Sequence, residues 1–159
     1  TPTGWLAEEI LNQIALTRAQ PGATGNVYFS MQTLMRDGDN LPRKLISGPY
    51  ASKALIPASP WLDSIPPLSP IVGVGRDPAT LSSTVSLQPQ GTEPIWLWLI
   101  RARVGDDWTT DVVPGIQRFY VVRRGAGGAF ADAVSVSAVD RTGNESAPVV
   151  VALTPAPSR

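Results

Sequence analysis

Apolar and polar positions alternate most clearly near the carboxyl end of the chain. Within residues 131–151, Val134 and Val136 fall on one side of an extended segment, and Ser135 and Ser137 fall on the other. A period of two is typical of a strand with one buried face. We therefore expect a β-strand here, with its valines turned toward a core.

A turn follows this strand at residues 140–144, which read Asp-Arg-Thr-Gly-Asn. Asp and Asn side chains bond nearby backbone groups, and Gly accepts the positive φ that tight turns require. Residues 149–151 are all valine, which restarts a β-branched run. The pattern predicts a hairpin.

Further β-type runs, bounded by Gly, Pro and Asp, precede the hairpin. Together with its two strands they predict a seven-stranded sandwich, which is the count of a fibronectin type III module. The runs are residues 71–74, 84–88, 95–104, 108–112 and 118–124.

The first third of the chain has a different pattern. Leu6, Ile10 and Ile14 recur at a spacing of four, which predicts an amphipathic helix over residues 3–19 with Thr3 as its cap. Residues 26–30 are apolar on both faces, as in a strand of a buried parallel sheet. A second short helix is predicted at Leu41–Ser47. This is part of an α/β pattern, and its single strand calls for neighbours that the segment does not supply.

A proline-rich stretch at residues 65–70 separates the two patterns. Proline stiffens a linker and removes backbone donors. We therefore predict three parts: an α/β segment at residues 1–64, a linker at 65–70, and a β-sandwich at 71–159.

Composition narrows the function. Thirteen basic and thirteen acidic residues cancel, and the chain has no Cys and no His. Neutrality argues against nucleic acid as a partner. Without Cys and His, thiol nucleophiles, His-based triads and Cys or His metal sites are excluded. No apolar run reaches membrane-spanning length, and the first residues lack the pattern of a signal peptide. We expect no cofactor.

Two tryptophans are candidate ligand contacts. Trp96 and Trp98 fall on one face of the predicted strand at residues 95–104, and leucines fall on the other. Flat aromatic rings stack on sugar rings, so this row could bind carbohydrate. Alternatively, one face packs in the core and the other docks on a neighbouring segment. We favour packing.

Acidic residues offer no metal site or catalytic pair. Asp37 and Asp39 resemble half of a calcium loop, but the bidentate Glu of such a loop does not follow. A solvated loop is the better interpretation. We predict no catalytic residue in this chain.

The string VSAVDRTGNESAP, at residues 136–148, resembles the last hairpin of fibronectin type III modules. The resemblance implies a sandwich and no particular chemistry. Two features of such modules are absent: Val134 stands at the usual tyrosine position, and Leu87 replaces a common tryptophan.

A second resemblance covers about sixty residues. The strings GNVYFSMQTL and ALIPASPWL resemble the end of glycoside-hydrolase-like family 10 proteins, bacterial exported proteins that are often lipoproteins. They have a (β/α)8 barrel followed by a fibronectin type III-like domain. The resemblance implies that Ser30 and Met31 end the eighth barrel strand, where barrel active sites lie. Ser30, Met31 and Trp61 are therefore candidate cleft residues. Ordinary packing between barrel and helix explains Ser30 and Met31 equally well, and it explains Trp61 better.

The sequence thus predicts a non-catalytic carboxyl-terminal fragment of an exported glycoside hydrolase, in the periplasm, on the outer membrane as a lipoprotein, or outside the cell. Its partner would be the rest of the barrel, or a second copy paired through residues 1–60. The alternatives are a free-standing carbohydrate-binding module and a structural contact domain.

Overall fold

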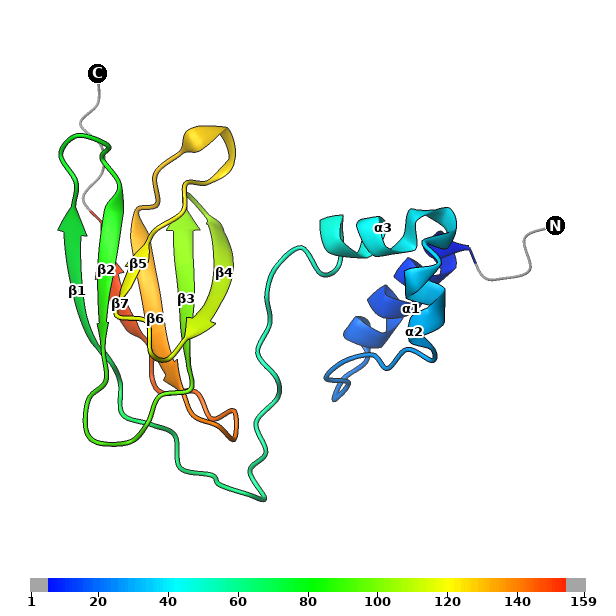
Figure 1. Cartoon of the computed structure of the whole chain (residues 1–159), viewed down its shortest axis with the longest axis horizontal. Helices are drawn as coiled ribbons and strands as arrows, with labels where there is room; N and C mark the ends of the chain where they lie inside the picture. The colour runs from blue at the N-terminus through cyan, green and yellow to red at the C-terminus, as the bar shows by residue number, and fades with distance from the viewer. Residues whose placement is uncertain (1–5, 154–159) are drawn as a thin grey trace. The chain divides into compact units, whose positions relative to one another are not determined.

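The computed structural model describes residues 6–153, apart from the side chains of Thr33 and Ala126. The chain forms two compact units, Thr1–Ser52 and Lys53–Arg159, which are described separately below (Figure 1). Thr3, the predicted helix cap, lies outside the described residues. Residues 53–64 belong to the second unit, whereas the sequence pattern assigned them to the first.

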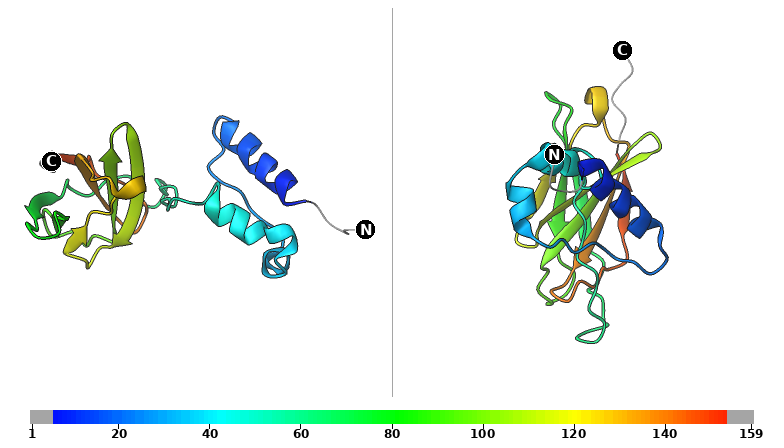
Figure 2. Two further views of the ribbon diagram at one scale, coloured as in Figure 1. Left: turned by 90° about the horizontal axis from the view of Figure 1, so that it is seen from above. Right: turned by 90° about the vertical axis from the view of Figure 1, so that its right-hand side faces the viewer.

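The second unit contains a sandwich of two antiparallel sheets, which confirms the predicted β-sandwich (Figures 1 and 2). One sheet has the order β1-β2-β5 and the other β4-β3-β6-β7. The strands are β1 Ile71–Arg76, β2 Ser83–Gln88, β3 Leu97–Val104, β4 Asp107–Pro114, β5 Phe119–Val121, β6 Ala133–Val139 and β7 Val149–Ala152.

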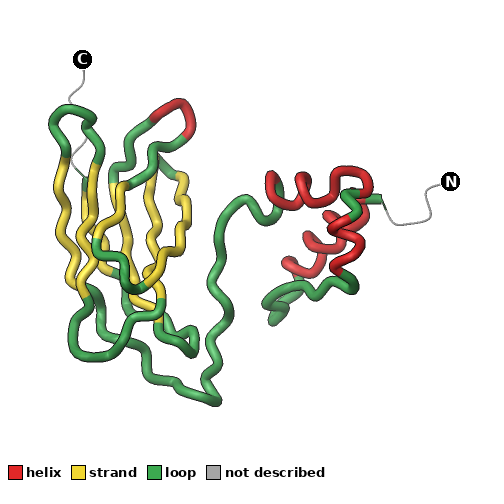
Figure 3. Tube along the Cα trace, in the orientation of Figure 1, coloured by secondary structure: helices red, strands yellow, loops and turns green. Residues whose placement is uncertain are grey.

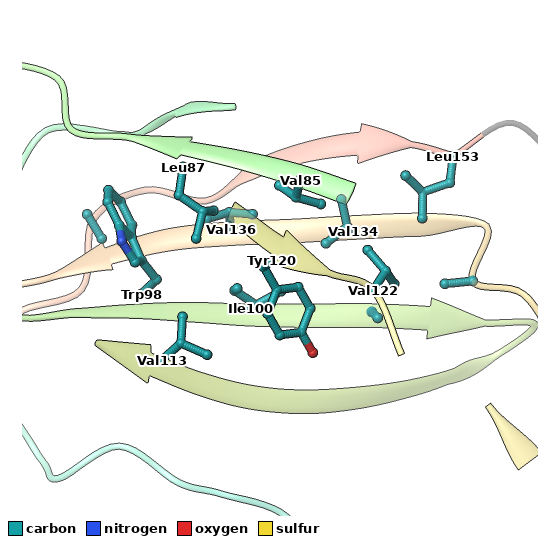
Figure 4. Close-up of a cluster of buried hydrophobic side chains, with 13 residues drawn as sticks. Val85, Leu87, Trp98, Ile100, Val113, Tyr120, Val122, Val134, Val136 and Leu153 are labelled. Atoms are coloured by element: carbon teal, nitrogen blue, oxygen red, sulfur yellow. The ribbon is translucent and has the colours of Figure 1, made fainter. Parts of the chain in front are cut away.

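Alternate residues of both sheets meet in one apolar core (Figure 4). Val85 and Leu87 come from β2, whereas Trp98 comes from β3 and Val134 and Val136 from β6; all five are fully buried. The period-two pattern correctly predicted that Val134 and Val136 face the core. The expectation of a single buried face is wrong, because every residue of β6 is buried, Ser135 and Ser137 included. Leu87 of β2 and Trp98 of β3 belong to this same core cluster.

The five strands before the hairpin all differ in length from the sequence prediction, β4 and β5 most of all. β4 extends to Asp107 and Pro114 because it pairs with β3 at eight successive positions. β5 has only three residues, since its pairing with β2 stops after Val121 and residues 125–129 close a glycine-rich turn. Pairing partners, rather than local propensity, decide these limits.

The first unit is a small helical cluster, seen in Figure 2. Its elements are α1 Ala7–Ala19, α2 Met31–Met35, η1 Gly38–Asn40 and α3 Leu41–Ser47. Ile14 of α1 and Leu45 of α3 lie in its buried centre. The helices predicted around α1 and α3 are therefore present.

Asp39 has a structural role in this unit. Its carboxylate accepts the Ala7 N–H at 3.0 Å, where the first turn of α1 has no intrahelical partner. It also lies 3.3 Å from Lys44 Nζ. The Ala7 hydrogen bond, followed by Lys44, lowers the pKa of Asp39. The Asp39 carboxylate therefore satisfies an amide at the start of α1.

The strand predicted at residues 26–30 is wrong. This segment has no strand pairing, and Val27 and Phe29 are fully exposed. A β-strand needs a neighbour to satisfy its backbone donors and acceptors, and this unit provides none within the described residues. The apolar sequence of a buried strand therefore remains as an extended, exposed segment.

Candidate functional site

The β6–β7 turn is organised around one buried carboxylate, that of Asp140. Its Oδ1 accepts the backbone N–H groups of Thr142 and Asn144 at 2.8 and 2.9 Å, and its Oδ2 accepts Asn144 Nδ2 at 2.8 Å. Burial alone would raise the pKa of Asp140, but the hydrogen bonds from Asn144 and Thr142 outweigh it and hold the pKa below its usual range. The turn is therefore a rigid, ionised motif.

This turn also binds the segment that precedes the sandwich. The Ser59 N–H donates to the Thr142 carbonyl at 2.8 Å, and Asn144 Nδ2 donates to the Asp63 carbonyl at 3.1 Å. Gly143, at φ +88°, lies against the same segment: a Cβ atom there would be 3.0 Å from Ala58 Cα. Residues 140–144 thus hold residues 58–63 through a backbone hydrogen bond, the side-chain amide of Asn144 and the close approach at Gly143.

A second attachment lies at the start of the unit. Lys53 Nζ lies 2.8 Å from Asp111 Oδ1 and donates to the Val112 carbonyl at 3.2 Å. Asp111 is nearly buried on the inward face of β4. Its Oδ2 lies 3.2 Å from Arg123 and accepts the Tyr120 hydroxyl at 3.2 Å.

One carboxylate at this attachment faces two cations, Lys53 and Arg123. Burial opposes ionisation of Asp111, but the hydrogen bond from Lys53 and the charge of Arg123 outweigh it, so its pKa lies below the usual range. Burial, followed by the charge of Asp111, raises the pKa of Tyr120 to about 12. Asp111 is therefore an anion and Tyr120 a neutral donor near neutral pH.

We call residues 53–70 the joint. It has no helix or strand (Figure 3), yet it is attached to the sandwich along its length. Besides the two attachments above, Ser69 Oγ donates to the Ala147 carbonyl at 3.0 Å, and Pro67 and Pro70 are buried. The sequence predicted a proline-rich linker at residues 65–70, and in the structure these residues are part of a docked segment that begins at residue 53.

The outward face of β3 is also buried at Leu99. Leu99 lies on the side of its sheet turned away from the core, beside Val112 in the register, yet it is only 2% exposed. The joint is attached at Val112 and again at Thr142, on either side of this strand in the sheet.

The predicted aromatic row does not form a surface platform. Trp98 is fully buried in the core and its Nε1 donates to the Gln117 carbonyl at 3.0 Å. Trp96 precedes β3 and is about one-third exposed. A buried ring cannot stack on a sugar, so the two tryptophans do not make a shared binding face.

The other candidate residues lie apart from one another. Ser30 is half-buried at the start of α2, and Met31 is an exposed residue in that helix rather than the end of a strand. Trp61 lies in the joint, on a turn in which the Leu62 N–H donates to the Ser59 carbonyl, and its ring is 79% exposed. Packing was the favoured expectation for Trp61, and its ring is not packed.

The sequence interpretation missed the cluster around Asp111. A signal was present, because Asp111 and Val113 share the inward side of β4, and an acid in a buried position must be paired. Among residues 6–153 no group of three acidic, His or Cys side chains could hold a metal ion. No helix in the described part of the chain is long and apolar enough to cross a membrane.

The fold and contacts define a β-sandwich module with a docked amino-terminal joint. No protein-family model matches the chain. The chain is similar to "Glycosyl hydrolase YngK" of Bacillus subtilis (strain 168), with 33% identity over 63 residues. The similarity covers 40% of this chain and 12% of that protein. It relates this chain to a glycoside hydrolase over that region, and the chain spans a small fraction of the relative.

Proposed function

We propose that this chain is a non-catalytic part of a larger, exported glycoside hydrolase-related protein, with the sandwich as its accessory module. The proposal rests on one observation: the buried carboxylates of Asp111 and Asp140 already accept hydrogen bonds or ion pairs from neighbouring residues of the fold. Glycoside hydrolysis requires a carboxylic acid whose pKa is raised, so that it can protonate the leaving oxygen, and a second carboxylate facing it. Asp111 and Asp140 instead have lowered pKa values and are occupied by structural donors.

The partner in this proposal is the rest of a barrel. Val27 and Phe29 are fully exposed, and Met35 is 79% exposed. Water disfavours apolar surface by about 25 cal/mol per Å². Further barrel strands would pair the backbone of residues 26–30 and cover these side chains. Ser30 and Met31 would then lie near the carboxyl end of a barrel strand, as the family resemblance implies.

A turnover assay on the purified chain tests the catalytic part of this proposal. We expect no hydrolysis of aryl glycosides. Turnover that is abolished by Asp111→Asn, with the melting temperature retained, would contradict it. In a longer protein that contains the barrel, the same substitution should leave kcat unchanged and affect only stability.

A homodimer through residues 1–60 is the competing way to cover the exposed apolar segment. Sedimentation of the full chain and of residues 53–159 separates the two cases. We expect both to be monomeric at micromolar concentration if the barrel is the partner. A dimer that dissociates when residues 1–52 are removed, or by Phe29→Ser, would favour self-association.

A further inference from the structure

The outward face of the β1-β2-β5 sheet exposes apolar side chains. Phe119 and Val121 of β5 are 66% and 59% exposed, and Ile71 of β1 is 54% exposed. Tyr120, between the two β5 residues, points into the core. Alternation along the strand therefore places Phe119 and Val121 on the solvent side.

Two glycines of β1 leave a depression in this face beside Phe119. Gly73 pairs with Ser86, and Ser86 pairs with Phe119, so the three residues form one row across the sheet. The next row is Gly75, Thr84 and Val121. Because β1 has no side chains at two outward positions, the sheet carries a shallow open depression of about 330 Å³, lined by Gly73, Val74, Gly75, Thr84, Ser86 and Phe119.

The position of the Ser86 hydroxyl depends on the glycine opposite it. The Gly73 N–H donates to Ser86 Oγ at 3.1 Å. A Cβ atom at position 73 would lie 2.7 Å from that oxygen, so a side chain there would displace the hydroxyl. At Gly75 a Cβ atom would meet no atom within 4 Å, which leaves that end of the depression empty.

The chemistry of this lining selects a ligand class. It combines an exposed aromatic ring with two hydroxyls and contains no charged side chain. A phosphate or nucleic acid would find no counter-charge among these residues. A pyranose ring has an apolar C–H face that can cover an aromatic ring, and hydroxyls that exchange hydrogen bonds with Ser and Thr. A neutral glycan fits both parts.

We propose that the outward face of the β1-β2-β5 sheet binds a neutral polysaccharide, with one sugar ring on Phe119 and its hydroxyls toward Ser86 and Thr84. The proposal rests on the proposed function, since it gives the accessory module a glycan to hold. The two can fail separately: the absence of turnover by the chain says nothing about glycan binding, and loss of glycan binding leaves the barrel relationship intact.

Native affinity electrophoresis of the full chain tests this proposal. The probes are soluble hydroxyethyl cellulose, laminarin, xylan and galactomannan, with polygalacturonate as the charged control. We expect at least one neutral polysaccharide to retard the protein. Phe119→Ala should weaken that binding about tenfold, since it removes the apolar area that the sugar covers.

Two further variants make the result specific. Gly75→Val should also abolish retardation, because it fills the depression at a position where a side chain meets no steric conflict. Trp108→Ala is the matched control, since Trp108 is an exposed aromatic on β4, in the other sheet, and it should bind like the unchanged chain. Thermal melting shows that each variant is folded.

Several results would overturn the proposal. The first is that no neutral polysaccharide retards the protein, or that only polygalacturonate does. The second is retardation that survives both Phe119→Ala and Gly75→Val in folded protein. The third is retardation that is lost in Trp61→Ala but kept in Phe119→Ala, which would place the site on the joint.

Discussion

The Ser59 N–H and the Thr142 carbonyl oxygen are 2.8 Å apart, and this hydrogen bond joins two segments separated by more than eighty positions in the chain. It fastens the joint to the β6–β7 turn, whose conformation depends on Asp140. The sandwich unit therefore includes the joint as well as the strands. The segment that would connect it to a preceding domain is part of the sandwich unit.

Removing the Asn144 side chain should release the joint. Asn144→Ala deletes the donor to the Asp63 carbonyl and the donor to Asp140 Oδ2. Leaving such buried groups unpaired costs about 1–3 kcal/mol of unfolding free energy. Chemical denaturation should show this loss, and limited proteolysis should show new cleavage within residues 54–63.

Glu145→Ala is the control for that experiment. Glu145 is a neighbour of Asn144, and its ion pair with Arg101 is partly exposed. Partly exposed pairs contribute about 0–1 kcal/mol. If proteolysis cleaves the joint equally slowly in Asn144→Ala and Glu145→Ala, the side-chain amide of Asn144 does not hold the joint.

The left-handed backbone conformation of Gly143 should also be needed for the stability of the folded chain. Gly143→Ala places a Cβ atom at φ +88° and 3.0 Å from Ala58 Cα. The left-handed conformation alone costs an L-residue about 1–2 kcal/mol, and the crowding adds to this. Gly75→Ala is the matched substitution, since it meets no neighbour and its φ is not positive. Differential scanning calorimetry should show a lower melting temperature for Gly143→Ala and little change or a rise for Gly75→Ala; similar losses in both would contradict this account.

Acid should weaken the fold through Asp111. Its folded-state pKa lies below the ordinary value of 3.8, so the carboxylate contributes stability that is present above that value and is lost as the pH falls through the folded-state pKa. Melting temperatures from pH 7 to pH 2 should therefore drop steeply below about pH 4. Asp111→Asn should lower stability at pH 7 and reduce the acid-dependent drop.

Asp140 remains in the Asp111→Asn variant and has a lowered pKa of the same sign, so part of the acid dependence should persist. An Asp111→Asn variant whose acid dependence matches that of the unchanged chain would show that the Lys53–Asp111–Arg123 cluster does not contribute. Asp63→Asn, in the joint, serves as a control, because Asp63 is bound mainly through its carbonyl oxygen and a local Ile65 N–H.

The two tryptophans of contrasting burial should differ in their effect on stability. Trp98→Ala empties a fully buried site and should cost about 3–5 kcal/mol. Trp61→Ala removes a ring that is 79% exposed and should change the unfolding free energy by less than about 0.5 kcal/mol. Urea denaturation followed by circular dichroism compares them, and similar losses would show that Trp61 is packed in solution.

Much of the fold could be predicted from local sequence. The alternation at Val134 and Val136 predicted which side chains of β6 enter the core, although not that its serine face is buried as well. The Asp-Arg-Thr-Gly-Asn turn predicted the hairpin. The spacing of Ile10 and Ile14 predicted α1. These elements follow from a repeat that matches the geometry of one strand or one helix, and both kinds of repeat are visible within a dozen residues.

The joint and its attachments could not be predicted in the same way. Asp111 is held by Lys53, Tyr120 and Arg123, which lie in three different parts of the chain. Residues 26–30 have the composition of a buried strand and form none, because strand formation depends on a partner rather than on composition. The depression at Gly73 can be recognised only when the pairing of the strands is known, because that pairing puts Gly73, Ser86 and Phe119 in one row.

By itself, the sequence determined the strands of the sandwich, the two main helices and the absence of Cys and His chemistry. The tertiary structure alone decided that Trp98 is core, that Trp61 is exposed, and that the joint belongs to the sandwich. The physical reason is the distance along the chain between the residues that interact. Periodicity and turn residues act between neighbours in the chain, whereas burial, ion pairing and docking depend on which distant segments the closed sheets bring together.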